Sequence, residues 1–129
     1  MFDRHFAVWP ENLPHHLTIP ETSLCTNLDV SALRYPEKPA IIYYDHTITY
    51  RELKRQVDAL AGYLQTLGVD KGDRVLLYMQ NAPQFIIGYY AILRANAIVV
   101  PINPMNRSAE LEHYLQDTQA SVCICSQEV

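Results

Sequence analysis

Glycine is scarce in this sequence, with only four glycines among 129 residues. They stand at positions 62, 68, 72 and 88, so no two of them form the Gly-x-Gly spacing or the Walker-type loop that brings backbone amides close to a phosphate. A phosphate-binding loop of either kind is therefore absent from these residues.

Long apolar runs and an excess of positive charge are also missing. No run approaches the roughly 18 residues that span a bilayer, and Met1 to His5 lacks the cationic start of a secretion signal. Ten Lys and Arg stand against fourteen Asp and Glu, which gives a net charge of −4 without the basic stripe of a nucleic-acid binder. We expect a cytoplasmic protein that binds no nucleic acid.

Cysteines are too few and too unfavourably spaced for a disulfide framework or a zinc site. Cys123 and Cys125 would point the same way along a strand, which is a poor geometry for a bond between them, and further zinc ligands are lacking. We predict that these two thiols and Cys25 are free and buried.

The composition that remains is that of one folded domain. Hydrophobic residues make up 49% and charged residues 19%, which excludes disorder over the whole length. The length also suits one domain rather than two.

The first 39 residues contain five of the eight prolines and little apolar periodicity. We expect an irregular segment that lies over another surface. Within it, Asn27 caps a short helix from Leu28 to about Arg34, and Pro36 stops this helix. The adjacent pair His15-His16 diverges in direction and is expected in a solvated loop rather than at a metal.

Three aromatic residues, Phe2, Phe6 and Trp9, lie in this N-terminal segment, which cannot form a core of its own. They must pack on the domain or on a partner, and a dimer contact is one of the alternatives. A structural interaction domain that uses this segment is therefore one functional hypothesis for the chain.

From Ala40 the pattern becomes regular. Two β-rich stretches, 41–44 and 47–49, flank the short turn Asp45-His46 and predict a β-hairpin. Thr49 and Glu52 have the spacing of a capping box, so a helix starts there, and Gly68 ends it. Its apolar stripe is Leu53, Val57, Leu60, Ala61, Leu64 and Leu67.

Strands and helices then alternate along the chain. Continuous apolar runs predict buried strands at 74–79, 97–100 and 121–125. Two helices lie between them, one that starts at Asn81 and Pro83 and one over 108–118, with Leu111, Tyr114 and Leu115 facing inward. This order predicts an α/β fold with a partial, mainly parallel sheet flanked by helices and preceded by the hairpin. No helix remains to cover the last strand, so we expect a truncated domain.

Several stretches stand in a recognisable order: 34–40 (RYPEKPA), 47–53 (TITYREL), 67–75 (LGVDKGDRV), 90–97 (YAILRANA) and 101–104 (PINP). Together they resemble the N-terminal part of the acyl-adenylate-forming, or AMP-binding, superfamily, over roughly residues 28–129. This superfamily includes acyl-CoA ligases, adenylation domains of peptide synthetases and luciferases. The resemblance implies that residues 1–39 are an irregular N-terminal segment and that 40–129 are the first portion of the AMP-binding domain.

Within the superfamily, Asn103-Pro104-Met105-Asn106 followed by 110–115 (ELEHYL) looks most like the fatty-acyl-CoA synthetases. Peptide-synthetase adenylation domains commonly have Asp-Pro at this turn. Asn96 is a departure, because the family often has glycine there. Asn is the next most tolerant residue of the left-handed conformation, so the same helix ending is expected.

The resemblance implies a ligase that activates a carboxylic acid with ATP and passes the acyl group to CoA. Such an enzyme uses a Gly/Ser/Thr-rich loop ending in Lys, a Thr-Glu pair for Mg²⁺, an Asp for the ribose and a C-terminal Lys, and none of these is present here. We therefore assign no catalytic, cofactor-binding or metal-binding residue in this chain. For the full-length enzyme the partners implied are fatty acid, ATP, Mg²⁺ and CoA, with homodimerisation and peripheral membrane contact open.

Other residues suggest chemistry but have a simpler explanation. Arg107 before the third helix and His113 on it are expected to be exposed. Tyr89 is expected in the core, with Tyr90 on the neighbouring face, rather than in an acyl tunnel. Residues 70–73 (DKGD) have the pattern of a solvated turn.

Two alternatives to the fatty-acid CoA ligase stay open for the function of the chain. One is another AMP-forming acid ligase, of aryl, short-chain or peptide-synthetase type. The other is a complete flavodoxin-like binding module.

Overall fold

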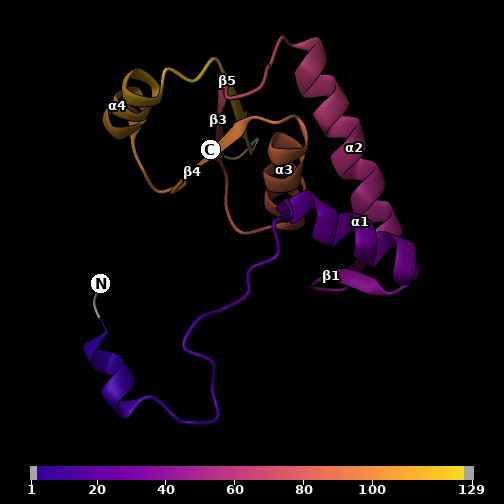
Figure 1. Ribbon diagram of the computed structural model, residues 1–129. Coiled ribbons are helices and arrows are strands. Elements are labelled where there is room, and N and C mark those ends of the chain that lie inside the picture. Colours follow the sequence, from indigo (N-terminus) through magenta and orange to yellow (C-terminus); the bar gives the residue numbers. More distant parts are fainter. Residues whose placement is uncertain (1–2, 127–129) are drawn as a thin grey trace.

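The computed structural model describes residues 3–126, and Figure 1 shows their arrangement. A 3-10 helix η1 (Arg4–Val8) and helix α1 (Leu24–Arg34) precede the hairpin strands β1 (Pro39–Tyr43) and β2 (His46–Thr49). The chain continues through α2 (Tyr50–Thr66), β3 (Arg74–Tyr78), α3 (Pro83–Arg94), β4 (Ile98–Ile102), α4 (Ser108–Thr118) and β5 (Val122–Cys125). The predicted α/β fold is confirmed, and each predicted strand and helix is present, two of them with shifted bounds.

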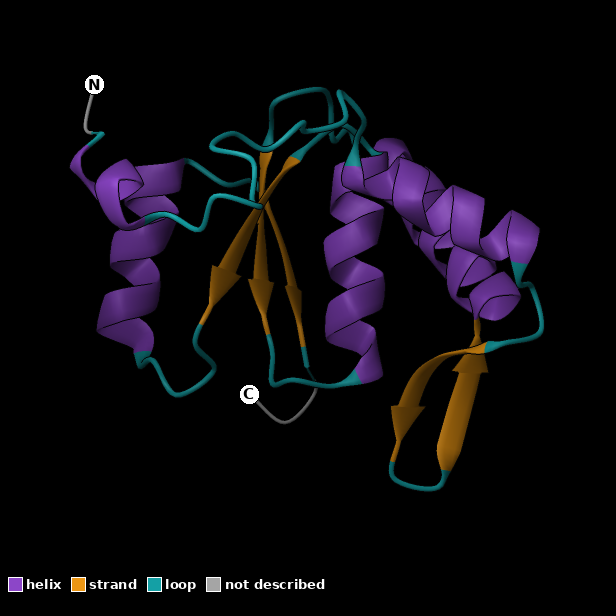
Figure 2. Ribbon diagram, turned by 60° about the horizontal axis from the view of Figure 1, so that its bottom comes forward, coloured by secondary structure: helices purple, strands orange, loops and turns teal. Residues whose placement is uncertain are grey.

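Strands β3, β4 and β5 form a parallel sheet in the order β4-β3-β5. The chain moves from β3 to β4 through α3 and then returns past β3 to β5 through α4. Right-handed crossovers in opposite directions require the two helices to lie on opposite faces, and Figure 2 shows α3 and α4 on either side of the sheet. The central strand β3 is covered on both faces, which explains its unbroken apolar run.

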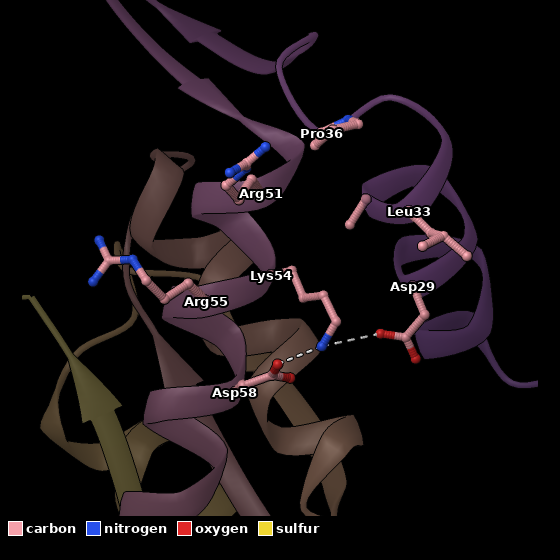
Figure 3. Close-up of a pocket in the computed structure, with 8 residues that line it drawn as sticks. Asp29, Leu33, Pro36, Arg51, Lys54, Arg55 and Asp58 are labelled. Atoms are coloured by element: carbon pink, nitrogen blue, oxygen red, sulfur yellow. Dashed lines mark hydrogen bonds and ion pairs between the residues drawn. The ribbon is translucent and has the colours of Figure 1, made fainter.

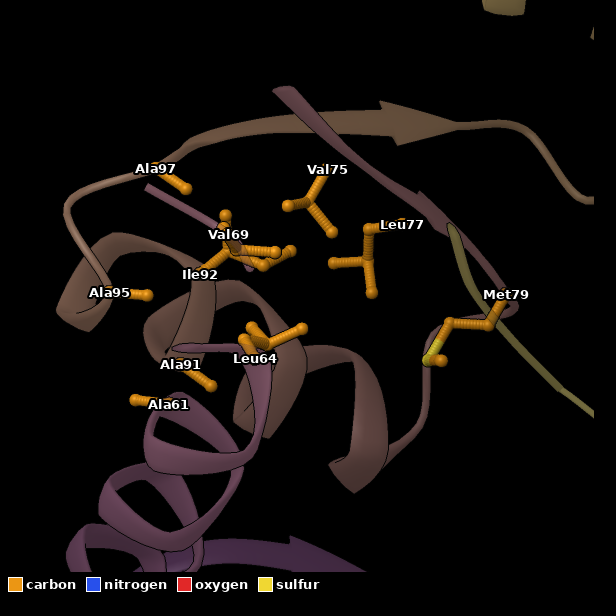
Figure 4. Close-up of a cluster of buried hydrophobic side chains, with 10 residues drawn as sticks. All are labelled: Ala61, Leu64, Val69, Val75, Leu77, Met79, Ala91, Ile92, Ala95 and Ala97. Atoms are coloured by element: carbon orange, nitrogen blue, oxygen red, sulfur yellow. The ribbon is translucent and has the colours of Figure 1, made fainter. Parts of the chain in front are cut away.

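The larger core lies on the α3 face, shown in Figure 4. Val75 and Leu77 of β3 point into it and meet Ala91 and Ile92 of α3 together with Leu64 of α2. Gly88 allows α3 to approach the sheet closely, because a Cβ at this position would lie 2.9 Å from Leu77 Cδ1. Small residues on α3 thus set the distance between helix and sheet.

The opposite face carries a smaller core under α4. Leu76, Tyr78 and Ile102 are its buried members, and Leu111 and Tyr114 of α4 pack against them. Helix α4 covers β4 and β3 but leaves β5 open, since Cys123 and Cys125 are exposed beside Leu76 and Tyr78. The expectation of an uncovered last strand is confirmed.

The hairpin β1-β2 forms a separate antiparallel sheet that extends away from the parallel sheet in Figure 2. Ile48 packs on Leu53 and Val57 of α2, Leu28 of α1 and Ile87 of α3, and this cluster anchors the base of the hairpin. Helices α1, α2 and α3 therefore meet through a second core.

The ends of the helices follow the local sequence signals. Thr49 Oγ1 accepts a hydrogen bond from the Glu52 amide at 3.2 Å and Glu52 Oε2 accepts one from the Thr49 amide at 3.0 Å, so the capping box is confirmed. Gly68, with φ 85°, ends α2, and Asn96, with φ 60°, ends α3 in the left-handed conformation expected for it.

Several sequence predictions need correction at the level of single residues. Helix α1 begins one turn earlier than predicted, because Ser23 rather than Asn27 caps it by accepting from the Thr26 amide. Strand β4 continues past Val100 through Pro101, which is tolerated on an edge strand. Leu67 and Leu115, which the sequence predicted to face inward, are exposed.

The cysteine prediction is correct for bonding and partly wrong for burial. All three cysteines are free, but only Cys25 is buried. Cys123 and Cys125 are exposed because α4 does not reach over β5. No helix among residues 3–126 is both long enough and apolar enough to cross a membrane.

Candidate functional site

The carboxyl ends of β3 and β4 are the first place to look for a ligand, because their connections leave toward opposite faces and open a crevice there in sheets of this kind. At this edge, β3, the loop after β4 and α4 are joined by hydrogen bonds. Tyr78 Oη donates to the Asn106 carbonyl at 2.7 Å, and Asn106 Nδ2 donates to Tyr114 Oη at 3.1 Å. These bonds fix the loop after β4 against the sheet.

The turn from β3 into α3 does not fit a nucleotide. It contains no glycine, the residue at the N-cap of α3 is Ala82 without a capping side chain, and Pro83 in the first turn has no amide hydrogen to donate. A phosphate cradle needs closely approaching backbone donors, and this turn does not provide one. No step of adenylation is assigned to its residues.

A hollow of about 630 Å³ lies between α1 and α2, and Figure 3 shows the residues around it. Asp29 and Leu33 come from α1, and Arg51, Lys54 and Asp58 come from α2. Lys54 forms ion pairs with Asp58 one turn along α2 and with Asp29 across the hollow, the latter at 3.4 Å. The charges that face the hollow are thus largely paired with one another.

Arg94 of α3 extends this network behind the hollow. Its guanidinium donates to both oxygens of Asp29, with Nη1 to Oδ2 at 2.8 Å and Nη2 to Oδ1 at 2.5 Å. Its Nε lies 3.2 Å from Asp58 Oδ1 without a hydrogen bond. Two cations and two carboxylates therefore join three helices.

The surroundings keep these groups charged. Hydrogen bonding from Arg94 holds the pKa of Asp29 below its ordinary value, and the hydrogen bond to Asp58 raises the pKa of Lys54. Burial raises the pKa of the nearby Cys25 thiol, so this cysteine is not an activated nucleophile. The network suits a structural role, because none of these shifts brings an acid or base toward neutral pH.

The remaining sequence candidates also have structural roles or are exposed. Arg107 is the exposed N-cap residue of α4, and its amide donates to Glu110 Oε2 at 3.0 Å. His113 is exposed. Asp73 Oδ2 accepts from the Asp70 amide at 2.8 Å, which makes 70–73 the turn that the sequence predicts.

The paired tyrosines divide between two environments. Tyr89 is half-buried and packs against the larger core, as predicted. Tyr90 is half-buried against the second core, at the base of the hairpin, and lines a hollow of about 220 Å³ with Tyr50 and Leu53. Among residues 3–126 no group of three or more His, Cys, Asp or Glu is placed to hold a metal ion.

Comparisons with known proteins show which protein family this chain resembles. The profile described as AMP-binding enzyme matches residues 28–129. A long-chain-fatty-acid–CoA ligase of Bacillus subtilis is 42% identical over 118 residues, which are 92% of this chain and 21% of that protein. The chain thus spans about a fifth of the length of this curated relative.

Solved structures show the same likeness. The N-terminal subdomain of NpsA from Klebsiella oxytoca, in complex with 3-hydroxybenzoyl-AMSN, superposes with a TM-score of 0.77 at 30% identity, over 83% of this chain and 27% of that one. The inhibitor-bound N-terminal domain of FACL13 from Mycobacterium tuberculosis gives a TM-score of 0.72 at 31% identity, over 76% and 25% of the two chains.

Proposed function

We propose that this chain, which belongs to the AMP-binding enzyme family, is the opening part of the large N-terminal domain of a fatty-acid CoA ligase. Residues 1–39 form its irregular entry and residues 40–129 the first part of the AMP-binding domain. The observation that carries the proposal is the 42% identity to a long-chain-fatty-acid–CoA ligase over most of the chain. The three-stranded sheet and its helices supply the scaffold.

In the full-length enzyme the fatty-acid carboxylate attacks the α-phosphate of ATP, which releases pyrophosphate and leaves an acyl-adenylate. The CoA thiolate then attacks the acyl carbon, forms the thioester and releases AMP. ATP supplies the adenylyl group and CoA supplies the thiol, and Mg²⁺, when bound, would neutralise phosphate charge. In this proposal the described residues contribute the parallel sheet and its helices, and the groups that contact the reacting atoms belong to other parts of the enzyme.

Two experiments test this proposal. Sequencing the reading frame beyond Val129 should reveal a Gly/Ser/Thr-rich loop ending in Lys within about one further domain length. A stop codon at position 130 would refute a ligase. The protein encoded by the full frame should then form hydroxamate from ATP, hydroxylamine and a long-chain fatty acid, with the fatty acid preferred over benzoate and over amino acids.

An aryl-acid ligase is the second candidate. The NpsA subdomain that superposes on this chain was solved with 3-hydroxybenzoyl-AMSN, and its fold is shared here. The same hydroxamate panel separates the two candidates, because a preference for benzoate-type acids over palmitate favours the aryl-acid enzyme and rejects the fatty-acid assignment.

A further inference from the structure

An apolar hollow of about 400 Å³ opens between β1 and the first turn of α3. It is called the Ile42 hollow below, after a side chain on its wall that is 71% exposed. An apolar ligand that covered this surface would remove it from water, which is favourable. The apolar side chains that form its walls include Ile41, Ile42, Tyr43, Pro83, Phe85 and Ile86.

The hollow of about 220 Å³ that Tyr90 lines, called the Tyr90 hollow, is its neighbour. Ile41 and Ile86 line both hollows, so the two share a wall. Leu28 and Leu53 of the second core form part of the Tyr90 hollow. Small-molecule sites in proteins commonly have volumes of about 300 to 1,000 Å³, and the two hollows together lie in this range.

The Tyr90 hollow differs from its neighbour in its hydroxyl groups. Ser31, Tyr50 and Tyr90 line it and are half-buried. Within residues 3–126 their side-chain oxygens have no hydrogen-bond partner, and none of these oxygens is fully buried. A ligand can therefore reach them, and each hydroxyl can both donate and accept a hydrogen bond.

Neither hollow has a charged lining. No Asp, Glu, Lys or Arg among the described residues lines either of them. A carboxylate or phosphate that entered would lose water without meeting a cation, which is costly. The lining thus favours a ligand that has an apolar part and an uncharged polar part.

Residues 3–23 of the same chain leave both hollows open. None of these residues lines either hollow, and Figure 1 shows the segment apart from the body. Its aromatic side chains pack on one another instead of lying over the domain as the sequence suggested. The Phe6 ring stacks on His15 with centroids 4.2 Å apart, and Trp9 meets Phe6 edge-on at 6.0 Å. Phe2 lies outside the described residues.

We propose that the two hollows together bind an uncharged amphiphile, with its alkyl chain in the Ile42 hollow and a hydroxyl or ester head at Tyr50 and Tyr90. Burial of the chain removes the apolar walls from water, and the head exchanges hydrogen bonds with the tyrosine hydroxyls. Fatty alcohols and monoacylglycerols belong to this class. The site stands apart from the adenylation reaction, so the proposal does not depend on the ligase function.

Titration with 1-decanol tests the site. Added to the 129-residue chain, it should shift the amide NMR signals of residues around both hollows and saturate with a dissociation constant below about 1 mM. Decanoate has the same chain length and a charged head at about pH 8. It should bind at least about tenfold more weakly, because the hollows offer no cation. Phosphatidylcholine vesicles distinguish a free amphiphile from a membrane surface.

Two variants and a matched control place the ligand. Ile86→Glu puts a carboxylate on the shared wall and should weaken decanol binding at least about tenfold. Leu115→Glu on α4 is the control, because Leu115 is 40% exposed and Ile86 is 36% exposed, and it should leave binding unchanged. Tyr90→Phe keeps the ring, and loss of its hydroxyl should weaken binding about two- to tenfold.

The amide spectra of the free variants show whether each is folded, and Tyr90→Phe carries the test if Ile86→Glu unfolds. Decanol binding that does not saturate would overturn the proposal. So would decanoate binding as tight as that of decanol, equal binding by the folded variants and the control, or attachment to vesicles without saturable binding of decanol.

Discussion

Arg94 of α3 donates two hydrogen bonds to the carboxylate of Asp29 of α1, although the two residues are 65 positions apart in the chain. Lys54 and Asp58 of α2 complete the network. It lies beside the core formed by Leu28 and Val57, so polar and apolar contacts fix the same three helices. The relative placement of α1, α2 and α3 is therefore specified twice.

Replacing Arg94 should destabilise the fold. Arg94→Ala leaves Asp29 and Asp58 facing each other without the bridging guanidinium, and we expect a loss of about 1 to 2 kcal/mol in the free energy of unfolding, because the side chains are partly exposed. Urea denaturation measures this change. Arg55→Ala on the exposed face of α2 is the matched control and should stay within about 0.5 kcal/mol.

The contribution of Asp29 should depend on pH. Its pKa in the folded protein lies below the ordinary value of 3.8, chiefly because of the hydrogen bonds from Arg94. A lowered pKa adds stability above the unfolded-state pKa, and this stability is lost as pH falls through the folded-state pKa. The stability difference between the unchanged chain and Asp29→Asn should thus be constant from about pH 5 to 7 and shrink below about pH 4.

Arg94→Ala provides the control for this titration. In that background the same Asp29→Asn substitution should show a smaller dependence on pH, since the main cause of the lowered pKa is gone. Equal pH profiles with and without Arg94 would refute the proposed cause.

Two glycines in helices should respond in opposite directions to alanine. Gly62→Ala places a methyl group in open space on α2 and should stabilise the protein by about 0.5 to 1 kcal/mol. Gly88→Ala places a Cβ 2.9 Å from Cδ1 of buried Leu77. This steric contact should lower the stability of the protein by about 1 to 3 kcal/mol, from which the gain in helix propensity is subtracted. Thermal unfolding of the pair measures the contrast, and an equal stabilisation would show that α3 can move away from the sheet.

The cysteines should differ in reactivity. Cys123 and Cys125 are exposed and Cys25 is buried, so DTNB should modify two thiols quickly at pH 8 and the third only after unfolding. Partial burial raises the pKa of the Cys123 thiol. DTNB should therefore react more slowly with Cys123 than with free glutathione. Cys123→Ser should leave one fast thiol. Three fast thiols would contradict the packing of α1 on α3.

Local signals in the sequence were sufficient to predict most of the fold. The Thr49–Glu52 capping box and the left-handed residues Gly68 and Asn96 depend only on neighbouring residues, and these predictions are confirmed. Burial of single side chains depends on partners distant in sequence. Ile86 is exposed and Ile87 buried because the hairpin and α2 determine which face of α3 is covered.

The sites were harder to predict for the same reason. The network of Asp29 and Arg94 joins two helices that no local motif relates, so sequence patterns gave no signal for it. The exposure of Cys123 also required knowing that α4 stops short of β5.

We propose that this chain supplies scaffold to an acid ligase and that the groups of its chemistry lie elsewhere in the protein. The most direct test is pyrophosphate release in the presence of ATP, Mg²⁺ and a long-chain fatty acid, measured for the purified 129-residue chain beside the protein encoded by the full reading frame. We predict release by the full-length protein and none above buffer by the chain alone. Turnover by the chain comparable to that of the full-length protein would contradict the account.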